Sequence, residues 1–257
     1  MDKILSSVIM PALNEEKNIL TAIDVTLKAF DDLGISGEVI VINDGSIDKT
    51  KELVEGLISK GGGRVRLLNH PAPQGVGASF WDGVDKAAGE IVFMLPGDNE
   101  NNPYETMRYL KLMEDVDMVV PFVFNKKARS GFRNILSYIY KLIINLTFNT
   151  SFNYTNGTVL YRKCVLTDFT YRDRGFFFQT DILIRLARKG YLFAEVPYSL
   201  GVREAGKSKA VSFSSFLKVA KGYLKLAIDM YLKREFYLNK YKFNKDSVSI
   251  KRYAHHG

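Results

Sequence analysis

The chain has little cysteine and no long apolar run. Its 257 residues contain one cysteine, Cys164, so no internal disulfide can form, and we expect a reducing, cytoplasmic compartment. No stretch of roughly 18 consecutive apolar residues occurs, so no transmembrane helix is expected. The first apolar run ends at Pro11, which makes it too short for a secretory signal, and we expect a strand there instead. The hydrophobic fraction of 46% is ordinary for a globular protein with a full core.

The net charge of +8 resides in the C-terminal segment. From Arg203 onward there are thirteen basic and four acidic residues, whereas the preceding residues have one more acidic than basic side chain. A basic segment of this kind either binds an anionic lipid surface or a nucleic acid, or is a solvated tail. Because no recognisable nucleic-acid-binding module accompanies it, we expect no nucleic-acid partner.

Strand-like and helix-like segments alternate in the first half of the chain. The apolar patterns predict strands at 6–10, 39–42, 64–68, 90–95 and 118–121, and helices at 15–30, 49–58, 76–88 and 103–113. This alternation predicts an α/β fold with a mostly parallel sheet flanked by helices on both faces. Ligands bind beyond the carboxyl ends of strands in such sheets, so we expect the polar segments 11–14, 43–46 and 96–98 to share one rim.

Two carboxylates, Asp98 and Glu100, follow the apolar run at residues 91–95. In an extended backbone both side chains would point to the same side of the chain, since strand side chains alternate. Oxygen ligands at the end of a central strand suit Mg²⁺ or Mn²⁺ held against a phosphate-bearing ligand. The alternative is a polar turn that binds nothing.

Three further segments place polar or flexible residues after predicted strands. Asn14 is placed to cap the helix that follows and Glu15 suits the positive end of that helix, so a structural role accounts for both. The carboxylate of Asp44 could accept hydrogen bonds from a base or ribose. Gly75 and Gly77 open a helix and permit close backbone approach to an anion.

The second half contains two amphipathic helices, at about 131–148 and at 213–231. The apolar stripe of the first consists of Phe132, Ile135, Leu136, Ile139, Leu142, Ile143 and Leu146, widened by Tyr140, Ile144 and Phe148. The stripe of the second consists of Phe213, Phe216, Leu217, Ala220, Tyr223, Leu224, Ala227, Ile228 and Tyr231. An apolar face beside a basic face is typical of a helix at a membrane surface; the alternative is that both stripes pack on the core.

Two other segments are suited to an active site. Asp181 lies in the first turn of a predicted helix, where it either complements the helix dipole or faces an acceptor. The glycine-containing loop at 201–209 carries Arg203 and Lys209, which could close over a diphosphate and neutralise its charge.

Six motifs, in order and spacing, resemble those of the inverting family-2 glycosyltransferases of the GT-A fold. They lie at residues 8–16, 41–50, 96–100, 156–162, 178–181 and 196–209. Within that family the chain is most similar to the polyprenyl-phosphate sugar synthases, over about residues 6–230. The resemblance implies a GT-A catalytic domain at 1–210, which includes the helix at about 131–148, and a basic amphipathic membrane-surface segment at 211–257.

The resemblance also implies a reaction and its residues. A sugar would move, with inversion, from GDP-mannose or a UDP-sugar to a polyprenyl or dolichyl phosphate, on an enzyme bound peripherally to the cytoplasmic face of a membrane. Asp98 with Glu100 would bind Mg²⁺ or Mn²⁺, and Asp98, Asp181 and Arg203 would act in catalysis. The implied donor-binding residues are Pro11, Asn14, Glu15, Asn43, Asp44, Ser46, Gly75, Gly97, Asp98, Arg203 and Lys209. The implied acceptor-binding residues are Asn156, Gly157, Gln179 and Asp181.

Several positions depart from the family pattern. Pro96 stands where the first Asp of the metal motif is usual, Asn43 where an Asp often sits, and Glu100 where relatives commonly carry Gln. Asn153 and Asn156 replace more usual acidic or small residues in the acceptor segment. Two alternatives therefore stay open, namely transfer to a glycan or another lipid, and a degenerate nucleotide-binding scaffold subunit.

Overall fold

Short runs of buried, mostly apolar residues form the central sheet. The structure is a computed structural model, and it describes residues 5–61, 63–124, 131–199, 213–233 and 242–254. Its strands are β1 (Ser6–Ala12), β2 (Gly37–Asn43), β3 (Val65–Asn69), β4 (Ile91–Met94), β5 (Met118–Val123), β6 (Leu160–Arg162) and β7 (Phe193–Tyr198). Every residue of β2 is buried, and its centre, Val39–Ile42, is a continuous apolar run, because a strand covered on both faces needs no alternation.

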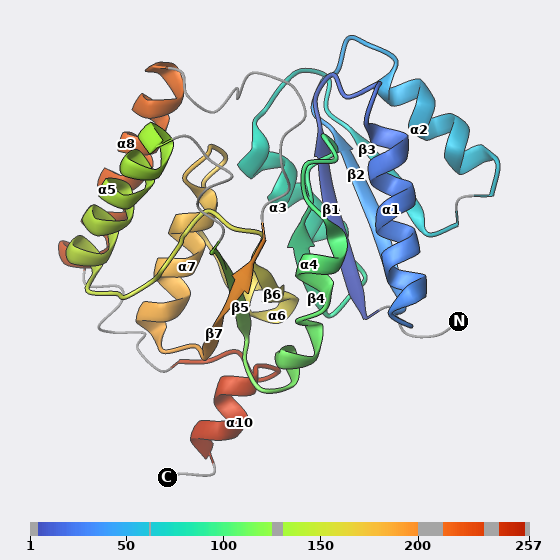
Figure 1. Cartoon of the computed structure of the whole chain (residues 1–257). Coiled ribbons are helices and arrows are strands. Elements are labelled where there is room, and N and C mark those ends of the chain that lie inside the picture. The colour runs from blue at the N-terminus through green and yellow to red at the C-terminus, as the bar shows by residue number, and fades with distance from the viewer. Residues whose placement is uncertain (1–4, 62, 125–130, 200–212, 234–241, 255–257) are drawn as a thin grey trace.

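Within the described residues, the seven strands form one sheet in the order β3-β2-β1-β4-β6-β5-β7 (Figure 1). β1 pairs in parallel with β2 and β4, β2 with β3, and β5 with β7. The predicted mostly parallel α/β sheet is therefore confirmed. β6 is the exception, since it runs antiparallel to both β4 and β5. The sequence pattern did not predict β6, because three residues are too few to show a period.

Helices cover both faces of the sheet (Figure 1). They are α1 (Ile19–Asp32), α2 (Thr50–Ser59), α3 (Val76–Lys86), α4 (Pro103–Met107), α5 (Gly131–Phe148), α6 (Lys163–Thr167), α7 (Phe178–Lys189), α8 (Phe213–Tyr231) and α10 (Val248–Ala254). One core cluster joins the sheet to α1, α2 and α4, and the other joins it to α3, α5, α7 and α8. The single helix predicted at 103–113 is wrong, since α4 is followed by a separate 3₁₀ turn, η1 (Leu110–Glu114).

The two amphipathic helices form an outer layer beside α7 (Figure 1). α5 contacts α8 through Phe148 and Tyr223, whose ring centroids lie 5.6 Å apart, and the hydroxyls of Thr147 and Tyr223 lie 2.8 Å apart. α5 contacts α7 through the hydroxyls of Tyr140 and Thr180, which are 2.9 Å apart. These contacts fix the rotation of α5 about its axis.

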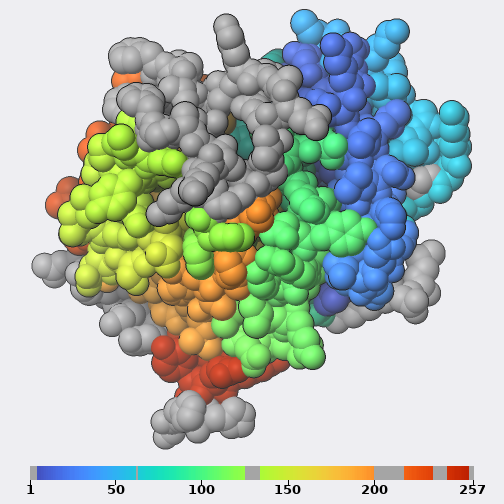
Figure 2. All heavy atoms as spheres, in the orientation of Figure 1, coloured from blue at the N-terminus to red at the C-terminus, as the bar shows by residue number. Residues whose placement is uncertain are grey.

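That rotation turns the predicted apolar stripe of α5 outward. The widening residues Tyr140, Ile144 and Phe148 face the protein, whereas Ile135 is 60% exposed and Leu146 is 74% exposed. α5 accordingly forms part of the molecular surface in Figure 2, where it is yellow-green. The alternative in which this stripe packs on the core is therefore wrong for its described residues.

α8 also turns part of its predicted stripe outward, although Tyr223 and Ala227 of that stripe pack against the core. Leu226 and Met230, which lie outside its predicted stripe, are buried in the core. We call the exposed apolar side chains of both helices, with the adjoining Leu232, the apolar band; they are Ile135, Leu136, Tyr138, Ile139, Leu142, Ile143, Leu146, Leu217, Leu224, Ile228, Tyr231 and Leu232. No helix in the described part of the chain is long and apolar enough to span a bilayer.

The last described helix, α10, packs against the start of β5. Asp117 is fully buried and accepts hydrogen bonds from the backbone N–H groups of Val248 and Ser249, at 2.8 and 2.9 Å. The hydroxyl of Ser249 also accepts a hydrogen bond of 2.8 Å from the N–H of Leu192, just before β7. The C-terminal segment is thus attached to the sheet at this point, while the division of the chain at residue 210 remains a prediction.

Candidate functional site

Three polar segments meet at the carboxyl ends of β2, β1 and β4. The N–H of Asp44 donates to the carbonyl oxygen of Ala12 at 2.8 Å, and the N–H of Gly97 donates to that of Pro11 at 2.9 Å. These contacts extend the sheet pairing beyond the strand ends. The prediction that the segments at 11–14, 43–46 and 96–98 share one rim is confirmed.

The loops after β1 and β2 are joined by reciprocal hydrogen bonds. The N–H of Asn14 donates to the Ser46 hydroxyl at 2.9 Å, and the Asn14 side-chain oxygen accepts from the N–H of Ile47 at 2.9 Å. The N–H of Glu15 donates to the Thr50 hydroxyl at 2.8 Å. The expectation that Asn14 caps α1 is wrong, because it has a left-handed φ of 58° and α1 begins only after Asn18. Asn14 instead fixes one loop against the other.

Asn43 also has a structural reason to be an amide. It is nearly fully buried, and its Nδ2 donates to Asn69 at 3.0 Å while its Oδ1 accepts from the N–H of Ser46 at 3.2 Å. An amide donates and accepts at the same time, whereas an ionised carboxylate only accepts. The amide of Asn43, which departs from the family pattern, is therefore suited to the one acceptor and one donor that surround it.

The Asp44 carboxylate organises the loop that leads into α3. Its Oδ1 accepts from the N–H of Gln74 at 2.8 Å and lies 2.7 Å from Nδ1 of His70, and its Oδ2 accepts from the N–H of Gly75 at 2.9 Å. Burial alone would raise the pKa of Asp44, but these hydrogen bonds outweigh it and hold the pKa below its usual range. Nε2 of His70 lies 3.0 Å from Oδ2 of Asp82, so His70 is held between two carboxylates.

Protein backbone occupies the start of α3, where the glycine pair was expected to approach an anion. The N–H of Ala78 donates to the carbonyl oxygen of Arg174 at 3.1 Å. A Cβ on Gly77 would lie 2.6 Å from the carbonyl oxygen of Gly175, and one on Gly75 would lie 2.9 Å from that of Arg174. The close approach is real, but the described partner is this chain's own loop at 173–175.

Asp98 and Glu100 do not lie in extended backbone. Asn99 between them has a left-handed φ of 59°, and the N–H of Glu100 donates to Oδ1 of Asp98 at 3.1 Å. The expected period-2 alignment is therefore wrong, since a turn separates the two carboxylates. Asp98 is half-buried and Glu100 is exposed. Gly97 is packed closely, because a Cβ there would lie 2.8 Å from Cδ1 of Ile19.

The predicted acceptor residues come together between β6 and α7. Nε2 of Gln179 donates to the carbonyl oxygen of Gly157, and the Thr180 hydroxyl donates to Oδ1 of Asn156 at 3.3 Å. Asn153 donates to both carboxylate oxygens of Glu195, through its N–H at 2.7 Å and its Nδ2 at 2.9 Å. An acidic residue in place of Asn153 would face that carboxylate, which gives a physical reason for the amide.

Asp181 is the most strongly perturbed carboxyl of this region. It is 1% exposed, and both its oxygens lie 2.9 Å from Nε of Arg185 one turn later in α7. Burial raises the pKa of Asp181 to about 6, even though Arg185 opposes this shift. Nη2 of Arg185 also donates to Oδ2 of Asp229 in α8 at 2.9 Å. A carboxyl with such a pKa titrates near neutral pH, as a general base or positioning group does.

Two predicted site residues lie outside the described residues, and three residues of the observed site were not predicted from the sequence. Arg203 and Lys209 fall in the segment 200–212, outside the described residues. His70, Arg185 and Asp229 were not singled out from the sequence. His70 directly follows β3 as Asp44 follows β2, so its position at a strand end was an available signal, whereas the partners of Arg185 are visible only in three dimensions.

The described fold is an α/β fold with a polar rim at the carboxyl ends of its parallel strands, the edge at which such folds bind ligands. Residues 7–170 match the family model described as Glycosyl transferase family 2. The chain therefore belongs to glycosyl transferase family 2, and the protein is a glycosyltransferase.

Two relatives named for lipid-phosphate acceptors are similar along most of this chain. A dolichyl-phosphate beta-glucosyltransferase of Trichomonas vaginalis is 28% identical over 86% of this chain and 72% of its own length. An undecaprenyl-phosphate 4-deoxy-4-formamido-L-arabinose transferase of Edwardsiella ictaluri is 25% identical over 79% of this chain and 62% of its own length.

Among solved structures, glucosyl-3-phosphoglycerate synthase from Mycobacterium tuberculosis has a similar fold. Its complex with UDP superposes with a TM-score of 0.66 at 18% identity and covers 87% of this chain and 80% of the other. Its complex with Mn²⁺, UDP-glucose and phosphoglyceric acid superposes with a TM-score of 0.65 at 18% identity, over 87% of this chain and 79% of the other. This likeness shows the GT-A fold.

Proposed function

We propose that the protein transfers a sugar from a nucleoside-diphosphate sugar to a polyprenyl phosphate, with inversion at the anomeric carbon. The names of the two relatives, with their dolichyl and undecaprenyl phosphate acceptors, support this acceptor class. The observation that carries the proposal is the apolar band on α5 and α8. A water-soluble acceptor needs no such surface, whereas a polyprenyl acceptor is reached only at a lipid surface.

The donor is proposed to bind along the rim formed by β2, β1 and β4. Pro11, Asn14, Glu15, Asn43, Asp44, Ser46, Gly75 and Gly97 line this rim or support its loops, and Arg203 and Lys209 are proposed to reach the diphosphate from the loop at 201–209. The sequence of the donor pocket does not select GDP-mannose over a UDP-sugar, so both remain proposed donors.

Asp98, with Glu100, is proposed to hold Mg²⁺ or Mn²⁺ against the donor diphosphate. Within the described residues no group of three His, Cys, Asp or Glu side chains is placed to hold a metal. Two carboxylates and the donor phosphates suffice for Mg²⁺, which commonly keeps water and substrate ligands. The metal, when bound, would stabilise the departing diphosphate. The half-buried Asp98 is the more enclosed of the two oxygen donors.

The reacting oxygen is proposed to come from the acceptor phosphate. It forms a bond to the anomeric carbon while the bond from that carbon to the nucleoside diphosphate breaks, and the diphosphate leaves with the electron pair. A phosphate monoester is largely ionised near neutral pH, because its second pKa is about 6. Asp181 therefore positions the acceptor more than it deprotonates it, with Asn156, Gly157 and Gln179 shaping the adjoining surface.

The experiment that tests this function is a transfer assay with purified full-length protein. GDP-mannose and UDP-glucose would be offered with Mn²⁺ to a polyprenyl phosphate and, in parallel, to a soluble glycan. We expect sugar transfer to the polyprenyl phosphate alone. In the cell, the enzyme is proposed to bind peripherally to the cytoplasmic face of a membrane. Transfer to the glycan alone would support the other acceptor class, and donor binding without turnover would support a scaffold subunit.

A further inference from the structure

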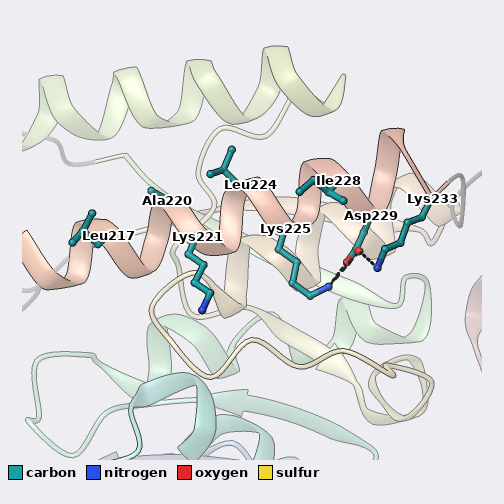
Figure 3. Close-up of a pocket in the computed structure, with 8 residues that line it drawn as sticks. All are labelled: Leu217, Ala220, Lys221, Leu224, Lys225, Ile228, Asp229 and Lys233. Atoms are coloured by element: carbon teal, nitrogen blue, oxygen red, sulfur yellow. Dashed lines mark hydrogen bonds and ion pairs between the residues drawn. The ribbon is translucent and has the colours of Figure 1, made fainter.

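A pocket lies along α8, which is on the opposite side of the molecule from α1 and α2 (Figure 1). It has a volume of about 560 Å³. Its lining within the described residues comes from Leu217, Ala220, Lys221, Leu224, Lys225, Ile228, Asp229 and Lys233. Figure 3 shows two edges: the leucines and Ile228 lie toward α5, and the three lysines extend in the other direction.

The basic edge carries more positive than negative charge. Nζ of Lys225 and Nζ of Lys233 each lie 3.0 Å from a carboxylate oxygen of Asp229, and Lys221 has no carboxylate partner among the described residues (Figure 3). Burial would raise the pKa of Asp229, but hydrogen bonds from Arg185, Lys233 and Lys225 lower it to about 2. The Asp229 carboxylate is thus ionised, and the three lysines still exceed it in charge.

The apolar edge continues into the apolar band. Leu217, Leu224 and Ile228 are 53%, 58% and 46% exposed, and α5 beside them exposes a further row of leucine and isoleucine side chains. An apolar surface bordered by lysines is complementary to the boundary between hydrocarbon chains and phosphate headgroups.

Arg185 separates this pocket from the proposed acceptor carboxylate. Its Nη2 faces Asp229 and its Nε faces Asp181, each at 2.9 Å. A phosphate held by the lysines is therefore on the far side of Arg185 from Asp181. It is a different phosphate from the one that would react at Asp181.

We propose that the α8 pocket binds the phosphate headgroup of an anionic bilayer phospholipid, and that this binding changes the position of the Asp181 carboxylate through its contacts with Arg185 and those of Arg185 with Asp229. The inference rests on the proposed function for the role of Asp181, but not for the binding itself. A headgroup phosphate competes with Asp229 for Lys225 and Lys233. When the two lysines bind the phosphate, Asp229 keeps its ion pair with Arg185. Arg185 is then the positioning residue that connects docking with the active site.

Vesicle binding of the full chain tests the site without donor or acceptor. Phosphatidylcholine vesicles with and without phosphatidylglycerol would be compared by co-sedimentation. The variant Lys221→Gln/Lys225→Gln/Lys233→Gln is expected to lose about 10-fold or more in affinity for the anionic vesicles, since each lysine near an anionic surface contributes severalfold. Affinity for pure phosphatidylcholine is expected to stay unchanged.

The matched control is Lys28→Gln/Lys51→Gln/Lys60→Gln, which removes the same charge from α1, α2 and the residue that follows α2. It is expected to bind like the wild type. Equal losses in both variants would overturn the proposal, since only net charge would then matter. Lys221→Glu alone is a second variant that is also expected to weaken binding to the anionic vesicles. Lys221 is exposed and makes no ion pair with the described residues, so folding should not depend on it. Lysine-dependent binding of the wild type to vesicles with polyprenyl phosphate, but not to vesicles with phosphatidylglycerol, would overturn the proposal and identify an acceptor site instead.

The connection to Asp181 is tested by the rate of sugar transfer on vesicles. Phosphatidylglycerol is expected to raise kcat in the wild type. Asp229→Asn is expected to bind the anionic vesicles at least as tightly, because its carboxylate no longer competes for Lys225 and Lys233, but to lose this stimulation. Stimulation retained in Asp229→Asn would overturn the connection through Asp229. If no donor and acceptor pair reacts at all, the proposed function fails, while the vesicle-binding result still decides the lipid site.

Discussion

The buried carboxylate of Asp117 accepts a hydrogen bond of 2.9 Å from the backbone N–H of Ser249. This contact ties α10 to the start of β5. Asp117→Ala is expected to lower the free energy of unfolding by at least about 2 kcal/mol, because it leaves several buried donors without an acceptor. Urea denaturation measures the change. The control is Asp115→Ala, which removes an exposed ion pair between Asp115 and Arg252 of α10. It is expected to lower the free energy of unfolding by less than about 1 kcal/mol, and equal losses in the two variants would contradict the prediction.

Gly77 is a position where one added methyl group should matter. Gly77→Ala would place a Cβ 2.6 Å from the carbonyl oxygen of Gly175 and 2.7 Å from the carbonyl carbon of Arg174. We expect the free energy of unfolding to fall by about 1–3 kcal/mol, because the start of α3 and the loop at 173–175 must move apart to make room for the methyl group. Gly56→Ala in α2 meets nothing within 4 Å and is expected to be stabilising. Thermal unfolding of the two variants provides the comparison.

Asp98 and Glu100 should differ in importance. Asp98→Asn is expected to reduce metal-dependent transfer about 100-fold or more, because metal stabilisation of a leaving diphosphate contributes several kcal/mol. Glu100→Gln, at an exposed position after the turn, is expected to have a smaller effect. Titration with Mn²⁺ in the presence of donor gives the metal affinity directly. Metal-dependent transfer left intact in Asp98→Asn would show that the metal assignment is wrong.

The rate of transfer should depend on pH through Asp181. Its buried carboxyl has a pKa of about 6, so kcat is expected to rise as the pH increases through this value and the carboxylate forms. The phosphate of the proposed acceptor would titrate at about 6 as well, so the wild-type profile alone does not separate the two groups. Arg185→Gln removes the cation that opposes the shift, and the acid limb is expected to move to higher pH. A limb set by the phosphate would stay in place.

The apolar band on α5 gives a prediction that is independent of α8. Ile143→Gln/Leu146→Gln is expected to weaken binding to phosphatidylcholine vesicles with little change in the free energy of unfolding, because Ile143 is 47% and Leu146 is 74% exposed in the folded protein. Leu33→Gln/Leu112→Gln replaces two exposed leucines elsewhere and serves as the control. Equal binding by both variants and the wild type would contradict a membrane role for α5.

The sheet and its rim could be predicted from sequence because each depends on local pattern. Buried parallel strands are short apolar runs, and polar residues such as Asp44 follow them directly. The side of α5 that faces the core could not be predicted in this way. Its stripe has seven apolar residues, yet Tyr140, Ile144 and Phe148 are the side chains that contact the core. The helix is apolar on two sides, and a periodic pattern does not tell which of the two is buried.

Two details of the site depend on backbone conformations and contacts that no periodicity records. Asn99 adopts a left-handed φ, which turns Asp98 away from the extended geometry in which it would align with Glu100. Gly77 resembles part of an anion-binding loop in sequence, but its partner is the carbonyl of Gly175, almost a hundred residues later. Only the folded chain brings these groups together.

The antiparallel strand β6 has a consequence for how such a protein can change. It lies between two parallel groups, β3-β2-β1-β4 and β5-β7, and pairs with each through only two residues. The register on its β4 side therefore places few constraints on the segment between β5 and β6 that includes α5. That segment can lengthen, shorten or change its surface while the rim at the carboxyl ends of β2, β1 and β4 keeps its alignment. One scaffold can in this way keep the proposed donor site and exchange the surface at which the proposed acceptor arrives.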